Sequence, residues 1–307
     1  MTRLAAAVLL LIVAACALAP IYAARVAGSD PFRSNVGGSV VVDGHSADVL
    51  AENTAGLGLG VTPVGPTWQG AYLLGADGQG RDVAARLLYG GRTSLLIAGG
   101  ATVLCLALAA VLGVVSGFVG GWTDGVLAGL LDLLWAFPVY LLAISLSIVL
   151  ISQDLQVGPI RIAADSLLLP VLIIGVVYVP YVARPIRAQV IALRGTEFIE
   201  AAIALGGTPP HILARHVLPH VWPTLAGFAP VVAAMALLTE AALSVLSIGV
   251  QAPAASWGTL IGDGQAMIYT RPAVAVAPGL AVVATVLALN VLGEALRVRL
   301  DPRGDRA

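Results

Sequence analysis

Six long apolar segments alternate with shorter polar stretches along this chain of 307 residues. Each is close to the ~20 residues that an α-helix needs to cross a bilayer core ~30 Å thick. They are too long and too uniformly apolar for the alternating strands of a membrane β-barrel. The pattern therefore predicts an all-α membrane protein whose transmembrane helices span approximately residues 4–24, 93–119, 125–151, 166–183, 224–249 and 273–292.

The composition also indicates contact with lipid. Hydrophobic residues make up 59% of the chain and charged residues only 11%, whereas a soluble domain carries about 25% charged residues. All 16 basic residues are arginines. A phosphate-binding Walker A loop needs a lysine to reach the nucleotide phosphates. The sequence therefore excludes a P-loop ATPase.

Arginines in the connecting segments predict the orientation, because positive charge marks the cytoplasmic side of short loops. They cluster in residues 184–215 and again in 297–306, which places both termini in the cytoplasm. The apolar run of the first helix continues past Cys16, which favours an uncleaved anchor over a lipoprotein signal peptide. The predicted parts are a first transmembrane helix (1–27), an extracytoplasmic loop with a short helix (28–92), five further transmembrane helices with a cytoplasmic loop at 194–223 (93–296), and a cytoplasmic tail (297–307).

The extracytoplasmic segment has little periodicity before Tyr72 and is rich in Gly, Pro, Ser and Asp, so we expect an irregular cap. Within it, the stretch from Asp77 to Asp82 alternates oxygen-bearing residues with glycines but lacks the glutamate that closes a calcium-binding loop. A turn leading into a short helix at 83–88 is the simpler interpretation.

The loop at 194–223 is patterned like folded structure. Thr196 can cap a helix, and Glu197 and Glu200 then lie near the N-terminus of that helix, where the macrodipole favours negative charge. Apolar residues recur on one face at i, i+3, i+4 and i+7, and a glycine pair ends the helix. These residues are Phe198, Ala201, Ala202 and Leu205, followed by Gly206 and Gly207.

A second short helix is predicted to begin after Thr208, with Pro209 in its first turn, and to end before Pro219. Neither helix can cross a membrane, and helices this short are unstable alone. They dock on a soluble partner or pack as an elbow on their own bundle; the periodicity leaves both interpretations open.

The run Glu200-Ala201-Ala202 with Gly206 and Leu218-Pro219 resembles the EAA loop of binding-protein-dependent ABC importer permeases. This resemblance implies a coupling helix that sits in a cleft of a separate ATPase subunit. His216 replaces an aliphatic residue of the general pattern, although Arg215-His216 is similar to the peptide-transporter subgroup. The resemblance assigns ATPase docking to Glu197, Glu200, Ala201, Ala202, Leu205, Gly206, Arg215, His216, Leu218 and Pro219.

Further motifs resemble C-type permeases of dipeptide, oligopeptide and nickel importers. They lie at residues 74–90, 120–138, 239–258 and 290–303, whereas 27–71 departs from that subgroup. The resemblance implies a type I importer bundle in the bacterial inner membrane that moves short peptides or a related small solute inward by alternating access. It also implies four partners on other chains: a second, B-type permease, two ATPase subunits that bind ATP and Mg, and an extracytoplasmic substrate-binding lipoprotein. The chain itself is then no enzyme, binds no cofactor or metal, and contacts lipid rather than nucleic acid.

Two carboxylates, Asp132 and Glu240, fall inside predicted spans, where an ionised group costs at least ~2.5 kcal/mol. We expect both to face the bundle interior. They line or gate the path of a substrate with a free amino group, pair with an arginine during alternating access, or form hydrogen bonds between helices, and the sequence leaves these roles open.

Small residues and prolines predict local helix geometry. Gly113 and Gly117 lie four residues apart and predict close helix packing rather than a hinge. Kinks are expected at Pro138, Pro170, Pro180 and Pro230.

The alternative functions have weaker support in the sequence. An ion-coupled secondary carrier would contain inverted repeats with broken spans, and we detect none. A membrane enzyme would carry a recognisable motif such as HExxH or GxSxG. His211, His216 and His220 crowd the docking loop, where we expect contact with a partner or solvent rather than a metal.

Overall fold

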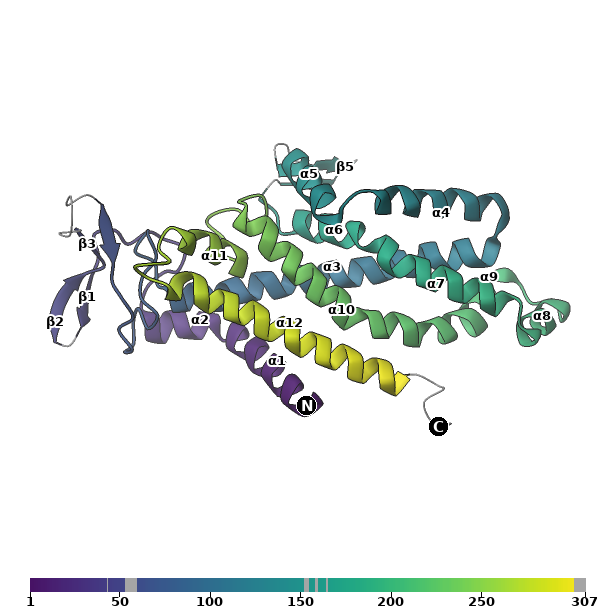
Figure 1. Ribbon diagram of the computed structural model, residues 1–307, viewed down its shortest axis with the longest axis horizontal. Helices are drawn as coiled ribbons and strands as arrows, with labels where there is room; N and C mark the ends of the chain where they lie inside the picture. Colours follow the sequence, from purple (N-terminus) through teal and green to yellow (C-terminus); the bar gives the residue numbers. More distant parts are fainter. Residues whose placement is uncertain (43, 53–59, 152–154, 158–159, 164, 301–307) are drawn as a thin grey trace. The chain divides into compact units, whose positions relative to one another are not determined.

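The computed structural model describes residues 1–42, 44–52, 60–151, 155–157, 160–163 and 165–300. The described chain is mainly helical, with three small antiparallel hairpins (Figure 1). The N-terminal half contains α1 (Thr2–Ala17), α2 (Ala19–Tyr22), η1 (Ala23–Ala27), β1 (Ser39–Val42), β2 (His45–Asp48), β3 (Leu50–Glu52), β4 (Val61–Pro63), α3 (Val83–Val119), α4 (Gly121–Ala136) and α5 (Val139–Ile151). The C-terminal half contains β5 (Leu155–Val157), β6 (Ile160–Ile162), α6 (Leu168–Val177), α7 (Val179–Arg194), α8 (Glu197–Ala204), α9 (Pro209–Ile212), η2 (Leu213–Val217), α10 (Leu218–Val245), α11 (Trp257–Gln265) and α12 (Ala273–Leu300).

Contacts divide the described residues into two compact units. Unit 1 comprises residues 1–5, 98–236 and 288 onward, and unit 2 comprises 6–97 and 237–287. Unit 1 therefore contains α4 to α9, and unit 2 contains β1 to β4 and α11.

Helices long and apolar enough for a membrane account for most of the described chain. Three qualify individually, namely α3, the continuous helical run 209–245 and α12. Three bent pairs, α1 with α2–η1, α4 with α5 and α6 with α7, raise the number of possible spans to six. The prediction of about six apolar helical spans agrees with this upper count.

The segment predicted as one span over 125–151, with a kink at Pro138, is bent by 90° where α4 and α5 meet, so the expected kink is confirmed. Pro138 lies at the break, and Phe137 before it has an extended backbone with φ −88° and ψ 137°. A proline disfavours the helical conformation of the preceding residue and lacks a backbone donor, so the helix ends there. A milder bend of 43° separates α6 from α7 at Pro180. Pro230 lies inside the uninterrupted α10.

Two helix boundaries also differ from the prediction. The short helix expected at 83–88 continues without a break into the span, so that α3 has 37 residues. The second helix of the 194–223 loop does not end before Pro219 but continues through η2 into α10. In both cases the backbone stays helical beyond the predicted end, and for the second helix it does so through Pro219, which falls in the first turn of α10.

The segment expected to be an irregular cap contains two hairpins, β1–β2 and β3–β4. In the first, Val40 pairs with Ala47, and in the second, Ala51 pairs with Thr62. A small core of Val49, Tyr72 and Ala76 lies beside them. Strands of three or four residues are too short to produce a recognisable alternation in the sequence.

Unit 2 is organised around Trp257, whose side chain is fully buried. Its indole nitrogen donates to the carbonyl of Leu87 at 3.0 Å, and its backbone N–H donates to the hydroxyl of Ser94 at 3.1 Å. A Cβ added at Gly91 would lie 2.8 Å from the indole ring. The glycine therefore allows α3 to approach Trp257 closely.

In unit 1, Gly113 and Gly117 of α3 face α7. A Cβ at either position would lie 2.8 Å from a backbone oxygen of α7, that of Ala183 or Arg187. The predicted close packing of this glycine pair is thereby confirmed.

Candidate functional site

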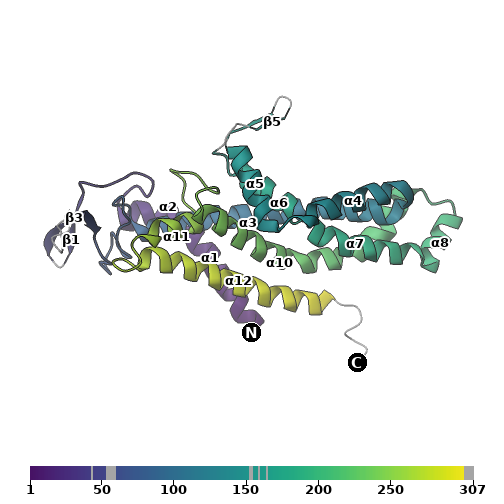
Figure 2. The ribbon, with the colours of Figure 1, turned by 45° about the horizontal axis from the view of Figure 1, so that its top comes forward.

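The loop predicted to dock an ATPase folds as α8 and α9 within unit 1. Thr196 precedes α8 with an extended backbone, as an N-cap residue does. Its hydroxyl donates to the carbonyl of Leu193 instead of accepting from the helix. In both ribbon views α8 lies beyond the ends of α4 and α7 (Figures 1 and 2).

The C-terminus of α8 is closed by a Schellman motif. Gly206 has φ +82°, and its N–H donates to the carbonyl of Ile203 at 2.9 Å. The N–H of Gly207 donates to the carbonyl of Ala202 at 3.0 Å. A left-handed residue is required at this position, which a glycine adopts without steric cost. The predicted glycine stop is confirmed, and it fixes the angle between α8 and α9.

The two faces of α8 differ sharply in exposure. Ile199 is fully buried, together with Ile212 and Val217 from α9 and η2. Leu205 is 89% exposed and Ile203 is 50% exposed. Apolar side chains thus point both into the loop and out of it. The inner set holds the elbow together, and the outer set is left without cover from the described chain.

The ten residues assigned to docking lie on the outside of this loop. Eight are exposed, and Ala202 and His216 are half-buried. The exposed eight are Glu197, Glu200, Ala201, Leu205, Gly206, Arg215, Leu218 and Pro219.

His220 ties the loop to α7 and α8. The amide nitrogen of Gln189 donates to the carbonyl of His220 at 2.9 Å. The ring of Phe198 stacks on the His220 imidazole with centroids 5.3 Å apart. These contacts connect α8 to α7 and to the start of α10. The predicted site list missed both Gln189 and His220, although the i, i+4 spacing of His216 and His220 places them on one face.

The expectation that Asp132 faces the bundle interior is wrong for the described chain. Its side chain is 68% exposed and lies 2.5 Å from the guanidinium of Arg184, which is itself 40% exposed. The guanidinium also lies over the Trp135 ring at 5.4 Å. An unpaired carboxylate in a membrane span is costly unless it faces the bundle interior. The ion pair with Arg184 of α7 neutralises the charge of Asp132, so this carboxylate can remain outside the interior.

Glu240 does face the interior, since only 1% of the residue is exposed. Its Oε1 accepts a hydrogen bond from the hydroxyl of Ser244 at 2.8 Å, one turn along α10. This contact belongs to unit 2. The hydrogen bond lies within α10, and the other carboxylate oxygen of Glu240 is buried without a hydrogen-bond partner among the described residues.

A second ion pair in unit 1 was not predicted. Arg187 donates to both carboxylate oxygens of Asp124, each at 2.6 Å, and the hydroxyl of Ser116 donates to Oδ1 at 2.5 Å. From the sequence, Arg187 is expected only to be one of the cytoplasmic charges of residues 184–215. The pair joins the first turn of α4 to α7, and the bidentate geometry is the strongest that an arginine can form with a carboxylate.

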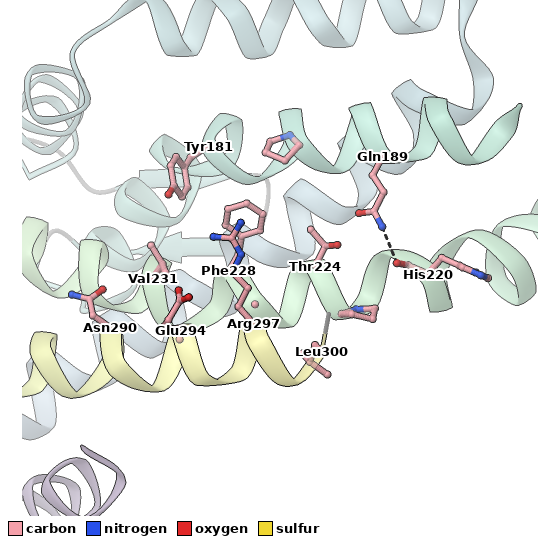
Figure 3. A pocket seen from close by; sticks show the side chains of 14 residues that line it. Tyr181, Gln189, His220, Thr224, Phe228, Val231, Asn290, Glu294, Arg297 and Leu300 are labelled. Carbon is pink, nitrogen blue, oxygen red and sulfur yellow. Dashed lines mark hydrogen bonds between the residues drawn. The ribbon is translucent and has the colours of Figure 1, made fainter. Parts of the chain in front are cut away.

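A pocket of about 700 Å³ opens between α7, α10 and α12 of unit 1. Figure 3 shows polar side chains from all three helices around it, among them Gln189, Thr224 and Glu294. The aromatic rings of Tyr181 and Phe228 line it as well, with centroids 5.7 Å apart. No motif in the sequence pointed to this cavity, because its lining comes from three separate helices.

Metal binding has no support in the described residues, where no cluster of three His, Cys, Asp or Glu side chains has ligand geometry. His211 and His216 approach each other with ring centroids 6.3 Å apart.

Comparison with known proteins identifies the family to which the chain belongs. Residues 109–306 match the family of binding-protein-dependent transport system inner membrane components. The chain belongs to this permease family. The permease is 32% identical over 238 residues to the oligopeptide transport system permease protein OppC of Haemophilus influenzae, covering 78% of this chain and 72% of the relative. It is 35% identical over 232 residues to the dipeptide transport system permease protein DppC of Alkalihalophilus pseudofirmus, covering 76% and 72%.

The fold of the permease is also found in a solved transporter. The inward-facing MetNI methionine ABC transporter matches with a TM-score of 0.55 at 16% identity, over 70% of this chain and 96% of the matched chain. The predicted type I importer fold and the family resemblance are therefore confirmed, as is a multi-pass location in the bacterial inner membrane. Neither the family nor the relatives support an ion-coupled carrier.

Proposed function

We propose that this permease moves short peptides inward by alternating access, driven by ATP hydrolysis on separate subunits that dock on α8 and α9. The observation that carries the proposal is the outward face of α8, where Leu205 is 89% exposed beside the fixed glycine turn at Gly206. An exposed leucine of this kind gains stability only when a partner removes it from water.

The complete transporter then contains four further chains. A second, B-type permease completes the path, two ATPase subunits bind ATP and Mg, and an extracytoplasmic lipoprotein delivers the substrate. This chain supplies neither nucleotide chemistry nor a bound cofactor. The peptide class follows from relatives whose names describe oligopeptide and dipeptide transport.

Orientation is part of the proposal. The loop 194–223 lies in the cytoplasm, as do both termini, and residues 28–92 lie outside. Alternating access requires that closure of the ATPase pair move α8, and through it the ends of α7 and α10. The stacking of Phe198 on His220 and the hydrogen bond from Gln189 provide that mechanical connection.

The test is a charge reversal on each side of the membrane. Glu200→Arg, on the exposed face of α8, should abolish co-purification of the ATPases and uptake of a labelled dipeptide. Asp48→Arg is the matched control, because it reverses an equally exposed carboxylate on β2. A Glu200→Arg complex that retains its ATPases and couples hydrolysis to uptake normally would refute the docking site. Substrate is tested in proteoliposomes containing the wild-type complex, where failure to take up any di- or tripeptide would refute the peptide class.

A further inference from the structure

The pocket between α7, α10 and α12 has the size and the chemistry of a ligand site. Its volume of about 700 Å³ falls within the ~300–1,000 Å³ that small-molecule pockets usually have. Aromatic and aliphatic groups form much of its wall, and a few polar side chains are placed among them. This mixture orients a ligand through the polar groups and desolvates the remainder.

Two opposite charges stand on one side of the pocket. Glu294 and Arg297 lie three residues apart on α12, one turn beyond Asn290, and all three line the cavity. Figure 3 shows Glu294 and Arg297 rising from α12 toward α10. Among the described residues, neither charge has an ion-pair partner within 4.0 Å. The cavity thus presents one anionic and one cationic group, both available to a ligand.

The opposite wall offers π surface and a hydrogen-bond acceptor. The ring of Tyr181 stacks on Trp135 with centroids 6.3 Å apart and meets Phe228 edge to face with centroids 5.7 Å apart. Aromatic faces pack against apolar groups of many shapes. Gln189 directs its amide nitrogen to His220, whereas its Oε1 is buried and has no hydrogen-bond partner. A buried acceptor without a donor is costly, so this oxygen is poised for an N–H group.

We propose that this pocket binds a zwitterionic short peptide, with Glu294 facing its ammonium group and Arg297 its carboxylate. The inference rests on the proposed peptide transport function and names the part of this chain that contacts the substrate. At pH 7 a free peptide carries a positive amino terminus and a negative carboxyl terminus. Residues three apart on a helix start ~5–6 Å apart, and a peptide of two or three residues is at most ~7–11 Å long. The side chains of Glu294 and Arg297 can therefore reach the two ends of such a peptide.

Binding of trialanine and its blocked forms tests the assignment. The transporter with its ATPases and second permease is purified in nanodiscs, without nucleotide and without the binding lipoprotein. The wild-type complex should bind trialanine about tenfold or more tightly than either N-acetyl-trialanine or trialanine amide, because each blocked form lacks one charge-assisted contact. Arg297→Gln should bind trialanine and its amide equally, and Glu294→Gln should bind trialanine and its N-acetyl form equally.

Arg299→Gln is the matched control, since Arg299 is exposed on the same helix but does not line the pocket. It should keep both preferences. Variants that retain the wild-type preference for free termini would overturn the assignment, as would a wild-type complex that does not distinguish the three ligands. ATPase co-purification and hydrolysis, measured on the same samples, report on the proposed docking function. If the Glu294 and Arg297 variants take up peptide normally and keep the wild-type ligand preferences, the pocket assignment is refuted, whereas the proposed transport function stands.

Discussion

Two regions of the molecule differ in what stabilises them: the outer face of the α8–α9 loop, and a charged cluster at the start of α3. The cluster consists of Asp77, Arg81, Arg86 and Asp263. The loop exposes apolar side chains such as Leu205 to solvent. The cluster buries charged ones, since the side chains of Asp77 and Arg86 are each only 3% exposed. Exposed apolar surface is stabilised by a partner, whereas buried charge is stabilised only by its own neighbours. The comparison separates a surface used for recognition from a part that holds unit 2 together.

The cluster is built from two carboxylates and two guanidiniums of unit 2. Asp77 Oδ2 lies 2.7 Å from Nε of Arg81 and 3.4 Å from Nε of Arg86. Asp263 approaches both arginines, at 3.2 and 3.4 Å, and remains 43% exposed. The four charges cancel. The cluster joins the turn before α3 to α11.

Asp82, at the N-terminus of α3, adds a further buried carboxyl to this region. Burial raises its pKa above the usual value, and hydrogen bonds from the backbone N–H groups of Ala85 and Tyr72 oppose that rise. The two hydrogen bonds are 2.9 and 2.6 Å long. The carboxyl therefore serves as a helix cap that also fixes Tyr72.

The largest effect is expected from Asp77→Asn. The substitution keeps the shape of the side chain but leaves two buried guanidiniums opposite Asp263 alone, so the free energy of unfolding should fall by ~3–5 kcal/mol. Denaturant unfolding of the purified permease in detergent measures it. Asp263→Asn is the internal comparison, and its loss should be smaller because water compensates the exposed partner. Equal stability of Asp77→Asn and wild type would show that the cluster does not hold unit 2 together.

These two regions also differ in how well the sequence predicted them. The loop was predictable because its signals are local: the cap at Thr196, the 3.6-residue period of α8 and the stop at Gly206 all lie within eleven residues. The cluster was not, because Asp263 is 177 residues from Arg86 and only folding brings them together. The stretch around Asp77 was interpreted as a plain turn, and the arginines that pair with it were counted only as external charges.

The same reasoning explains the other differences from prediction. Apolar runs located the spans and Pro138 predicted a kink, but the size of that bend, 90°, and the continuity of α3 depend on backbone conformations that hydropathy does not contain. The pocket on α7, α10 and α12 depends on three helices packing at a given spacing. Sequence periodicity assigns a face to each helix and says nothing about which faces meet.

A matched pair of truncations on α8 tests the loop half of the comparison. Ile199→Ala should destabilise the permease by ~2–5 kcal/mol, because Ile199 is fully buried and its loss leaves a cavity. Leu205→Ala should change the stability by less than ~0.5 kcal/mol, since the side chain is exposed. Only Leu205→Ala should weaken ATPase co-purification while leaving the fold intact. Unfolding curves and pull-down yields, measured on the same preparations, distinguish these outcomes; equal destabilisation by the two variants would contradict the assignment of inner and outer faces.

A small effect is expected at Asp132, because its ion pair with Arg184 is exposed. Asp132→Asn removes the partner of Arg184, but both side chains are largely accessible, so the loss of stability should stay within ~0–1 kcal/mol. Arg184 keeps its contact with the Trp135 ring. The unfolding midpoint in detergent should therefore match wild type within error, in contrast to Asp77→Asn. A loss as large as that of Asp77→Asn would mean that exposure does not separate structural ion pairs from dispensable ones in this permease.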